Sequence, residues 1–393
     1  MTPTLSLFLL FGAARANPTA PETPAPAPTA APAATAGSAQ VVVGVDLWPG
    51  VGTSALGRGQ DRRVLSTGLV CWAGSVEGAE ACAVGGVLTE GVEGLQAGGL
   101  FAMAGGPVHG AQLGGAFTRS GGAVEGAAGS GALSLVAGPV DGALGAGAVA
   151  MADGPVHGVV AAGLLTRAVG VEGLQAAGLI NISAGPVDGA QLSGGLNLVE
   201  GDLRGLQAGV VNITSGDVDG VMFGLVNVAD NADAAIGLVN ILRDGRKVWE
   251  LSATEEGLGR VIRKAGGRKV HTLWAAGIDP SQRAAAWSLG AGVGLHHGAE
   301  GRRLWVDTDL LAEHRSPINQ LRFDTDALFS ARAQVGVQVA GPLSVVAGPA
   351  WNLRLTEGQT AGGPPERWPS LQAGAGRYTV QQWPGVQVGL TLQ

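Results

Sequence analysis

Apolar and polar residues alternate over most of the C-terminal part of the chain, from about Val248 onward. In FDTDALFSARAQVGVQV, which begins at Phe323, nearly every second residue is apolar and most residues between them are polar or charged. The segments PLSVVAGPAWNLRL and VQVGLTLQ have the same period of two. This is the period of a β-strand whose two faces have different surroundings. Because the alternation often extends over about ten residues or more, it is typical of a membrane β-barrel.

Eight segments with this pattern predict a small antiparallel outer-membrane barrel. The first is QVVVGVDLW, within residues 39–50, and the remaining strands fall within residues 247–393. A barrel of about eight strands is filled by its own side chains. We expect residues 41–48 to close it by pairing with residues 386–393, and residues 254–267 to be a long turn or a short helix. The later strands are expected at 247–253, 268–278, 285–297, 302–314, 323–339, 342–355 and 384–393.

Charged residues on the face opposite the apolar one would lie inside this barrel. We expect them to form ion pairs there, because a buried unpaired charge is costly. The candidates are Asp307, Asp309, Asp324, Asp326, Arg332 and Arg354, together with Asp46 and Glu250. Tryptophans in or beside the strands are expected to form an aromatic girdle at the membrane interface. They are Trp48, Trp249, Trp274, Trp287, Trp305, Trp351 and Trp383.

A second periodicity, of about sixteen residues, covers residues 64–243. A glycine returns at 78, 94, 110, 126, 142, 158, 173, 189, 205 and 220. Two columns of amides accompany it: Gln96, Gln112, Gln175, Gln191 and Gln207, and Asn181, Asn197, Asn212, Asn227 and Asn240. Sixteen residues suit one coil of a β-solenoid, in which equivalent residues stack about 4.8 Å apart. We expect the amides to form hydrogen-bonded ladders, with doubtful continuity around 126, 142 and 158, where both amides are missing.

The repeats have a second interpretation, in which each copy is one membrane strand of about eleven residues followed by a turn. The chain would then form a wide outer-membrane channel. That arrangement predicts aromatic girdles within the repeats, but residues 75–243 contain only Phe101, Phe117 and Phe223 as aromatic residues. The sequence favours the solenoid and leaves its handedness open.

The repeat VEGLQAAGLINIS, followed by VWELSATEE and FSARAQVGVQVAGPLSVVAGPAWNL, resembles bacterial surface repeat-containing outer-membrane proteins. Repeats of that family read approximately G-[LVA]-Q-x-[AG]-G-[LV]-x-N. The segment VVVGVDLWPGVGTS is similar to the first-strand segment before their repeats, so the resemblance covers about residues 40–393. It implies an outer-membrane location and no particular biochemical activity.

The start of the chain, MTPTLSLFLLFGAARANPTA, predicts a signal peptide over residues 1–16, cut after Ala16. Residues 17–38 are rich in Pro, Ala and Thr and predict an extended linker. Residues 64–243 hold 15 acidic and 4 basic side chains, within a chain of net charge −7. This acidic region argues against nucleic acid as a partner. Cys71 and Cys82 are the only cysteines, and the sequence leaves open whether they form a disulfide.

No residue pattern predicts catalysis, a metal site, a cofactor or a small-molecule substrate, because the six histidines lack metal-ligand spacing and no nucleophile–base arrangement is evident. If residues 39–50 are the first barrel strand and both barrel ends are periplasmic, strand parity places the solenoid outside the cell. The sequence thus predicts an all-β protein whose solenoid is inserted after the first barrel strand. We expect a non-enzymatic protein that is either displayed at the cell surface or structural. A displayed solenoid could also act in adhesion. Its expected partners are outer-membrane lipid and an extracellular ligand or neighbouring surface protein; the ligand and oligomeric state stay open.

Overall fold

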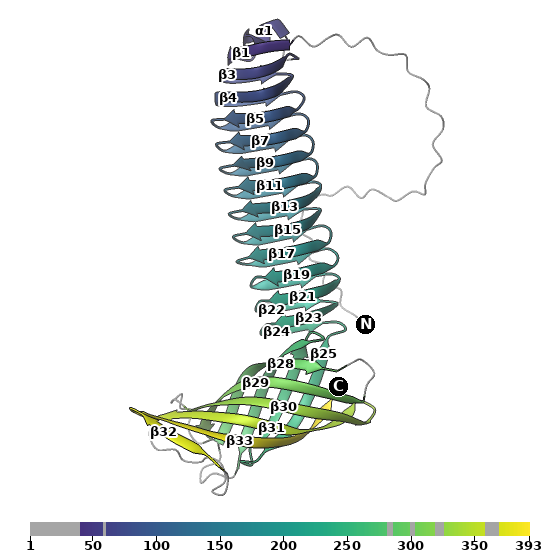
Figure 1. The fold of residues 1–393 in the computed structure, drawn as a ribbon, viewed down its shortest axis with the longest axis vertical. Helices are drawn as coiled ribbons and strands as arrows, with labels where there is room; N and C mark the ends of the chain where they lie inside the picture. Colours follow the sequence, from purple (N-terminus) through teal and green to yellow (C-terminus); the bar gives the residue numbers. More distant parts are fainter. Residues whose placement is uncertain (1–39, 58–59, 281–285, 299–302, 319–325, 358–368) are drawn as a thin grey trace, which may run out of the picture. The chain divides into compact units, whose positions relative to one another are not determined.

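The computed structural model describes residues 40–57, 60–280, 286–298, 303–318, 326–357 and 369–393. Ala39–Gln393 form one compact unit, in which a β-solenoid is followed by a closed eight-stranded antiparallel barrel (Figure 1). The all-β class, the solenoid and the small barrel are therefore confirmed, whereas the predicted order of the two parts needs correction. The signal peptide predicted over 1–16 and the linker predicted over 17–38 lie outside the described residues.

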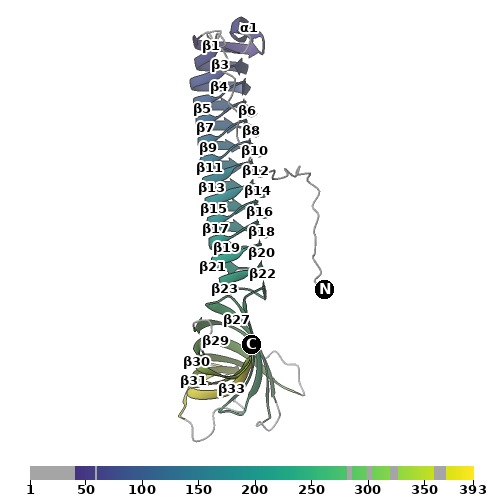
Figure 2. The ribbon, with the colours of Figure 1, turned by 90° about the vertical axis from the view of Figure 1, so that its right-hand side faces the viewer.

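Most coils of the solenoid contain one longer and one shorter strand, and the two kinds form separate stacks (Figure 2). The solenoid begins with β3 (Arg62–Ala73) and β4 (Ser75–Leu88). The longer strands that follow are β5 (Val92–Gly98), β7 (Val108–Gly114), β9 (Val124–Ser130), β11 (Val140–Ala146), β13 (Pro155–Ala162), β15 (Gly170–Ala177), β17 (Val187–Ser193), β19 (Leu203–Ala208), β21 (Asp217–Phe223) and β23 (Asn231–Ile236). The shorter strands are β6 (Phe101–Ala104), β8 (Phe117–Ser120), β10 (Leu133–Val136), β12 (Val149–Ala152), β14 (Leu165–Ala168), β16 (Ile180–Ser183), β18 (Leu196–Val199), β20 (Val211–Thr214), β22 (Val226–Ala229) and β24 (Val239–Leu242).

Strands in this region pair in parallel with their equivalents in the next coil. Gln175 thus lies beside Gln191, and Asn181 beside Asn197. A membrane barrel built from successive repeats would instead need antiparallel neighbours. The parallel pairing excludes the channel interpretation of the repeats. About 11 turns are stacked in this way.

The recurring glycine is required by the close approach of adjacent coils. Gly94 has a φ of 123°, and a Cβ at that position would lie 2.2 Å from the carbonyl oxygen of Gly78. No L-residue side chain fits there. Two residues before the glycine, Val92 and its equivalents point into the solenoid and form much of its buried core. The glycine and the valine together fix the register in which each coil pairs with the next.

The described part of the predicted first barrel strand, residues 40–50, does not belong to the barrel. β1 (Gln40–Trp48) pairs in parallel with β3 and antiparallel with β2 (Val51–Gly52), next to the short helix α1 (Ser54–Gly57). This group caps the N-terminal end of the solenoid (Figure 1). The predicted pairing of 41–48 with 386–393 is therefore wrong. A period of two is the same for a capping strand as for a barrel strand, so the alternation in QVVVGVDLW does not distinguish them.

The barrel closes through the antiparallel pairing of β25 with β33, in which Trp249 lies opposite Leu392. The short strand β32 (Leu371–Ala375) pairs with the beginning of β33, beside the closed ring. The eight strands of the ring are β25 (Arg246–Thr254), β26 (Gly259–Gly266), β27 (Val270–Asp279), β28 (Ala286–His297), β29 (Leu304–Pro317), β30 (Asp326–Ala340), β31 (Leu343–Glu357) and β33 (Tyr378–Leu392).

The strand that completes the ring in place of residues 39–50 is β26, which lies within the segment 254–267. The prediction of a turn or short helix there is wrong. Ile262 and Lys264 point into the barrel and are fully buried, whereas Val261 points outward and is 47% exposed. Because Arg263 also lies on the outer face, beside Trp249, charges on both faces conceal the alternation.

The solenoid precedes the whole barrel instead of being inserted after its first strand. It continues into β25 through residues 243–245, at the end of the barrel where β33 finishes. The short turns 267–269 and 341–342 lie at this same end. The long connection between β31 and β33 lies at the opposite end. The prediction of an extracellular solenoid assumed that a barrel strand precedes the solenoid. The described residues contain no such strand, so strand parity no longer supports that location.

Candidate functional site

Two runs of the glutamine column form hydrogen-bonded ladders inside the solenoid. Gln112 Nε2 donates to Gln96 Oε1 at 2.9 Å, and Gln96 Nε2 donates to Glu80 Oε1 at 2.9 Å. These amides are fully buried, so each one satisfies a neighbour that water cannot reach. In the second run, Gln207 Nε2 donates to Gln191 Oε1 at 2.8 Å, and Gln191 Nε2 donates to Gln175 Oε1 at 2.9 Å.

The coils around 126, 142 and 158 interrupt the glutamine column with apolar residues. Buried Ala128, Leu144 and Val160 occupy the equivalent positions. Thr166 then connects the two columns, because its hydroxyl accepts from Gln175 Nε2 at 2.9 Å and donates to Asn181 Oδ1 at 2.6 Å. A hydrophobic section thus separates two polar sections of the same core.

The asparagine column is continuous over its five members and reaches the barrel. Each Nδ2 donates to the Oδ1 of the next asparagine at 2.8 to 2.9 Å, in the order Asn181, Asn197, Asn212, Asn227 and Asn240. Asn240 Nδ2 donates to Thr272 Oγ1 of β27 at 2.8 Å, and that hydroxyl donates to the carbonyl oxygen of Ala265 at 2.9 Å. One chain of hydrogen bonds therefore connects the solenoid core with the barrel wall.

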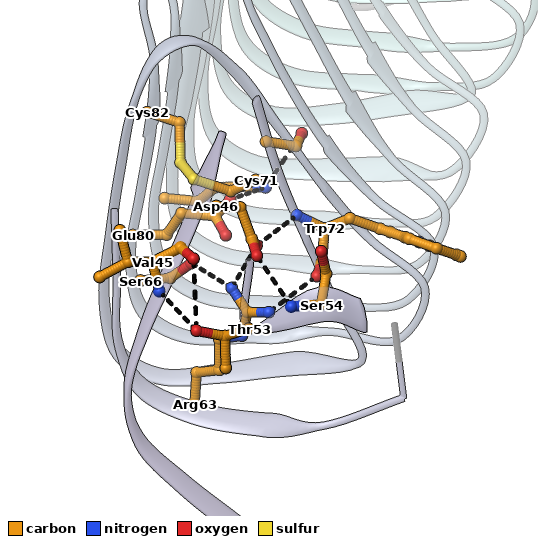
Figure 3. The surroundings of a disulfide bond; sticks show 12 residues. Val45, Asp46, Thr53, Ser54, Arg63, Ser66, Cys71, Trp72, Glu80 and Cys82 are labelled. Carbon is orange, nitrogen blue, oxygen red and sulfur yellow. Dashed lines mark hydrogen bonds and ion pairs between the residues drawn. A yellow bond between two sulfur atoms is a disulfide. The ribbon is translucent and has the colours of Figure 1, made fainter. Parts of the chain in front are cut away.

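A buried ion cluster lies at the N-terminal end of the solenoid (Figure 3). Arg63 is fully buried and lies 2.6 Å from a carboxylate oxygen of both Asp46 and Asp61. Asp46, expected inside the barrel, is thus a residue of the cap. Burial acts to raise the pKa of Asp46, but hydrogen bonds from Arg63 and Ser54 outweigh it and the pKa is lowered.

Cys71 of β3 and Cys82 of β4 form a disulfide beside this cluster, with Cα atoms 6.1 Å apart (Figure 3). This settles the pairing that the sequence left open. Glu80, also in β4, is fully buried and is the acceptor at the start of the first glutamine ladder. Burial raises the pKa of the Glu80 carboxyl, and hydrogen bonds from Gln96 and Ser66 offset this only in part.

Lys264 is the centre of an ion network inside the barrel. Its Nζ lies 2.8 Å from Asp307 Oδ2, 2.9 Å from Asp309 Oδ2 and 3.0 Å from Glu250 Oε2. Arg332 adds contacts of 2.9 Å to Glu250 and 2.8 Å to Asp309. All five side chains are buried. Arg246 lies 2.8 Å from Asp307, so three cations compensate these three carboxylates by direct contact.

Further ion pairs occupy the barrel towards its opposite end. They join Arg260 to Glu313 at 3.0 Å, Arg315 to Asp279 at 2.6 Å and Arg354 to Asp326 at 2.8 Å. Of the interior charges expected from the sequence, Asp324 lies outside the described residues. These pairs and the Lys264 network fill much of the lumen with charged side chains.

The predicted tryptophan girdle is only partly present. Trp249, Trp274 and Trp351 are 49%, 39% and 51% exposed on the outer wall, and Trp287 is half-buried. Trp48 belongs to the solenoid cap, and two other tryptophans are buried inside the barrel, Trp305 and Trp383. Their inclusion in the girdle was wrong, because Trp305 has the same strand parity as the inward residues Asp307 and Asp309.

Several residues of the ion network were not predicted from the sequence. Lys264 and Arg260 lie in the segment taken for a turn, and His271 and Arg315 had no assigned partners. The alternation of Arg260, Ile262 and Lys264 is the signal that could have identified β26. Partners across the lumen depend on the register of the closed ring, which sequence order does not contain.

Two groups of side chains have the spacing of metal ligands among the described residues. In the first, His271 Nε2 lies 3.0 Å from Asp309 Oδ1, with Asp307 nearby. Lys264 already supplies a cation to both carboxylates, so this group is an ion network in the structure. In the second, around Glu80, the cysteine sulfurs are joined as a disulfide and offer no thiolate.

Comparisons with family models, curated proteins and solved structures found no match. Within the described parts of the chain, no helix is both long and apolar enough to cross a membrane.

Proposed function

We propose that the barrel anchors this protein in a bacterial outer membrane and that the solenoid is a structural arm in the cell envelope. The main support for the proposal is that the barrel has apolar residues on its outer wall and charged residues in its interior. Leu310 and Val388 on the outer wall are 62% and 59% exposed, whereas Lys264 and Asp307 in the interior are fully buried. A lipid environment suits an apolar wall around a charged interior.

Closure of the ring supports the same environment. Pairing of β25 with β33 leaves the eight-stranded ring without an open edge. A bilayer requires this, because its core has no water to satisfy unpaired backbone groups. In water, by contrast, each Å² of exposed apolar wall would cost about 25 cal/mol. Outer-membrane lipid is therefore the partner that we propose for the barrel.

The filled lumen favours an anchor over a conduit. Buried ion pairs such as Lys264–Asp307 and Arg332–Glu250 lie across the interior. Opening a path for solutes would separate charges that compensate one another at about 3 Å, which is strongly unfavourable. We assign the barrel no transport or catalytic role.

The connections of the barrel favour a periplasmic solenoid over the surface display expected from the sequence. Outer-membrane barrels have short periplasmic turns and longer extracellular loops. The turns 267–269 and 341–342 lie at the solenoid end, and the long 358–377 connection lies at the other end. A stack of about 11 turns would extend roughly 50 Å from the membrane. Such an arm is suited to holding an acidic surface against another envelope component.

Labelling of single cysteines in intact cells tests both the anchor and its orientation. Asp188→Cys places a thiol on an exposed position of the solenoid, and Gln372→Cys places one on β32 at the opposite end of the barrel. We expect a membrane-impermeant maleimide to label Gln372→Cys in intact cells and Asp188→Cys only after the outer membrane is permeabilised. The parent chain is the control for background labelling, because Cys71 and Cys82 form a disulfide.

The opposite labelling pattern would establish surface display instead. Recovery of the protein in the soluble fraction, with both thiols equally reactive, would refute the membrane anchor.

A further inference from the structure

A polar vestibule opens at the solenoid end of the barrel. It has a volume of about 750 Å³ and lies between the segment that leaves the solenoid and the ends of several barrel strands. Arg246, His296 and Trp305 are among its lining residues and come from β25, β28 and β29. Among the ion pairs described above, only that of Arg246 with Asp307 involves a residue that lines it.

Two residues that line the vestibule each carry a buried N–H group without an acceptor among the described residues. The two groups are Nε of Arg246 and Nε1 of Trp305. Trp305 is only 5% exposed, and the Arg246 guanidinium lies over its ring, 5.1 Å from the centroid. Nη2 of Arg246 is used by Asp307 at 2.8 Å. A buried donor without an acceptor is costly, so these two N–H groups indicate a ligand that accepts hydrogen bonds.

Gly336 leaves room for the indole ring of Trp305. It pairs with Trp305 across the β29–β30 register, and a Cβ at this glycine would lie 2.1 Å from Cε2 of the indole. The ring is thereby held in the wall of the vestibule beside Arg246.

Five cationic side chains line the vestibule. They are Arg243, Arg246, Lys247, Arg268 and Lys269, and the lining also includes Asp244 and Gln393. Most of these cations have carboxylate partners, which reduces their net effect. Lys247 differs, because its Nζ donates to the carbonyl oxygen of Arg243 at 3.1 Å and has no carboxylate partner in the described part of the chain.

We infer that this vestibule binds an oxyanion of the phosphate type. An anion of this kind would accept hydrogen bonds from Trp305 Nε1 and Arg246 Nε and would be attracted by the ammonium group of Lys247. It would satisfy two donors that are themselves buried from solvent. The oxyanion is either a free phosphate or the headgroup of an anionic lipid at the membrane surface, and both offer the same chemistry.

Calorimetric titration of inorganic phosphate into the full chain, refolded in a non-ionic detergent at constant ionic strength, tests the site. We expect saturable binding of one phosphate. Trp305→Phe keeps the ring but removes the donor, and should weaken binding about tenfold. Lys247→Gln removes an exposed charge, with little risk to folding, and should also weaken binding. Arg377→Gln, an exposed cation at the opposite end of the barrel, is the matched control and should not change it.

The source of the anion follows from the same titration in lipid nanodiscs. If anionic phosphatidylglycerol competes with phosphate and zwitterionic lipid does not, the site takes a lipid headgroup; if neither lipid competes, it takes free phosphate. Absence of saturable binding would overturn the proposal. So would binding that both Trp305→Phe and Lys247→Gln leave unchanged. The detergent experiment does not depend on which side of the membrane the solenoid occupies.

Discussion

At the scale of single residues, stability of the solenoid depends on amides that are both donors and acceptors. Asn197 is fully buried, accepts from Asn181 at 2.9 Å, and donates to Asn212 Oδ1 at 2.9 Å and to the carbonyl oxygen of Ala208 at 2.7 Å. An apolar residue in its place would leave these partners unsatisfied in a region without water. The column therefore stabilises the fold only if it is complete.

Asn197→Ala tests this dependence. Because several buried polar groups lose their partner, we expect the free energy of unfolding of the solenoid to fall by about 2 to 4 kcal/mol. The measurement is denaturant unfolding followed by circular dichroism. Asp188→Ala, exposed in the same coil, is the control and should change the stability by less than about 0.5 kcal/mol. Equal effects of the two substitutions would show that the ladder adds no stability.

Glu80→Gln makes the opposite prediction, a gain in stability. Burial raises the pKa of Glu80 above its ordinary value of 4.5, so the folded state favours the protonated carboxyl. Stability is then lost as the pH rises above that ordinary value, because the buried group must ionise. A glutamine carries no charge and can still accept from Gln96. We expect a higher melting temperature than the parent at pH 8, and a smaller change in melting temperature between pH 5 and pH 8.

A gain of 1 kcal/mol would correspond to about 2 to 4 °C in a domain of this size. Gln96→Glu, which adds a second carboxyl to the column beside Glu80, is the matched control and should have the opposite effect. If Glu80→Gln lowers the melting temperature at pH 8, the carboxylate is stabilising and the interpretation of Glu80 is wrong.

At the scale of elements, the sequence identifies strands better than it identifies their neighbours. The repeated glycine and asparagine align one coil with the next, so the solenoid and its amide columns follow from periodicity alone. β1 and β26 show the limit. β1 alternates like a barrel strand but caps the solenoid, and β26 belongs to the barrel although Arg263 interrupts its apolar face.

The candidate site shows the same limit for side chains. Asn181 and Asn197 meet because they are equivalent in a repeat. Lys264 and Asp309 meet only because the ring closes with a particular register, and no sequence spacing records that contact. The vestibule depends on closure in the same way, since Arg246 and Trp305 come from separate strands.

Lys264→Met tests the ion network of the barrel. It leaves Glu250, Asp307 and Asp309 close together without their shared ammonium group, which should destabilise the barrel by about 3 to 5 kcal/mol. The readout is the denaturant concentration at which the barrel unfolds in detergent micelles. Arg263→Met, at the neighbouring outward position, is the control and should cost less than about 1 kcal/mol. A parent-like barrel after Lys264→Met would mean that the carboxylates do not need this cation.

At the scale of the whole Ala39–Gln393 unit, both ends of the solenoid are covered. β1, β2 and α1 cover the first coil, and the last coil contacts the barrel, where β23 pairs with β27. Asp233 of the last coil also forms ion pairs with Arg268 and Lys269 at 3.1 and 2.7 Å. A stack of repeats needs such caps because its first and last coils would otherwise each have an unpaired edge. The barrel therefore serves the solenoid as a cap as well as being its proposed anchor.

Thr272→Val tests whether the barrel stabilises the solenoid through the asparagine column. Valine has nearly the shape of threonine but cannot accept from Asn240 Nδ2 or donate to the carbonyl oxygen of Ala265. In a linear array each coil contacts mainly its neighbours, so the effect should decrease with distance from the barrel. We expect faster amide hydrogen exchange in β22 to β24, by about tenfold for a loss of 1.4 kcal/mol, and unchanged exchange in β5 to β8. Thr308→Val, on the outer barrel wall, is the control. Unchanged exchange in β22 to β24 would show that the contact between Asn240 and Thr272 does not couple the two parts.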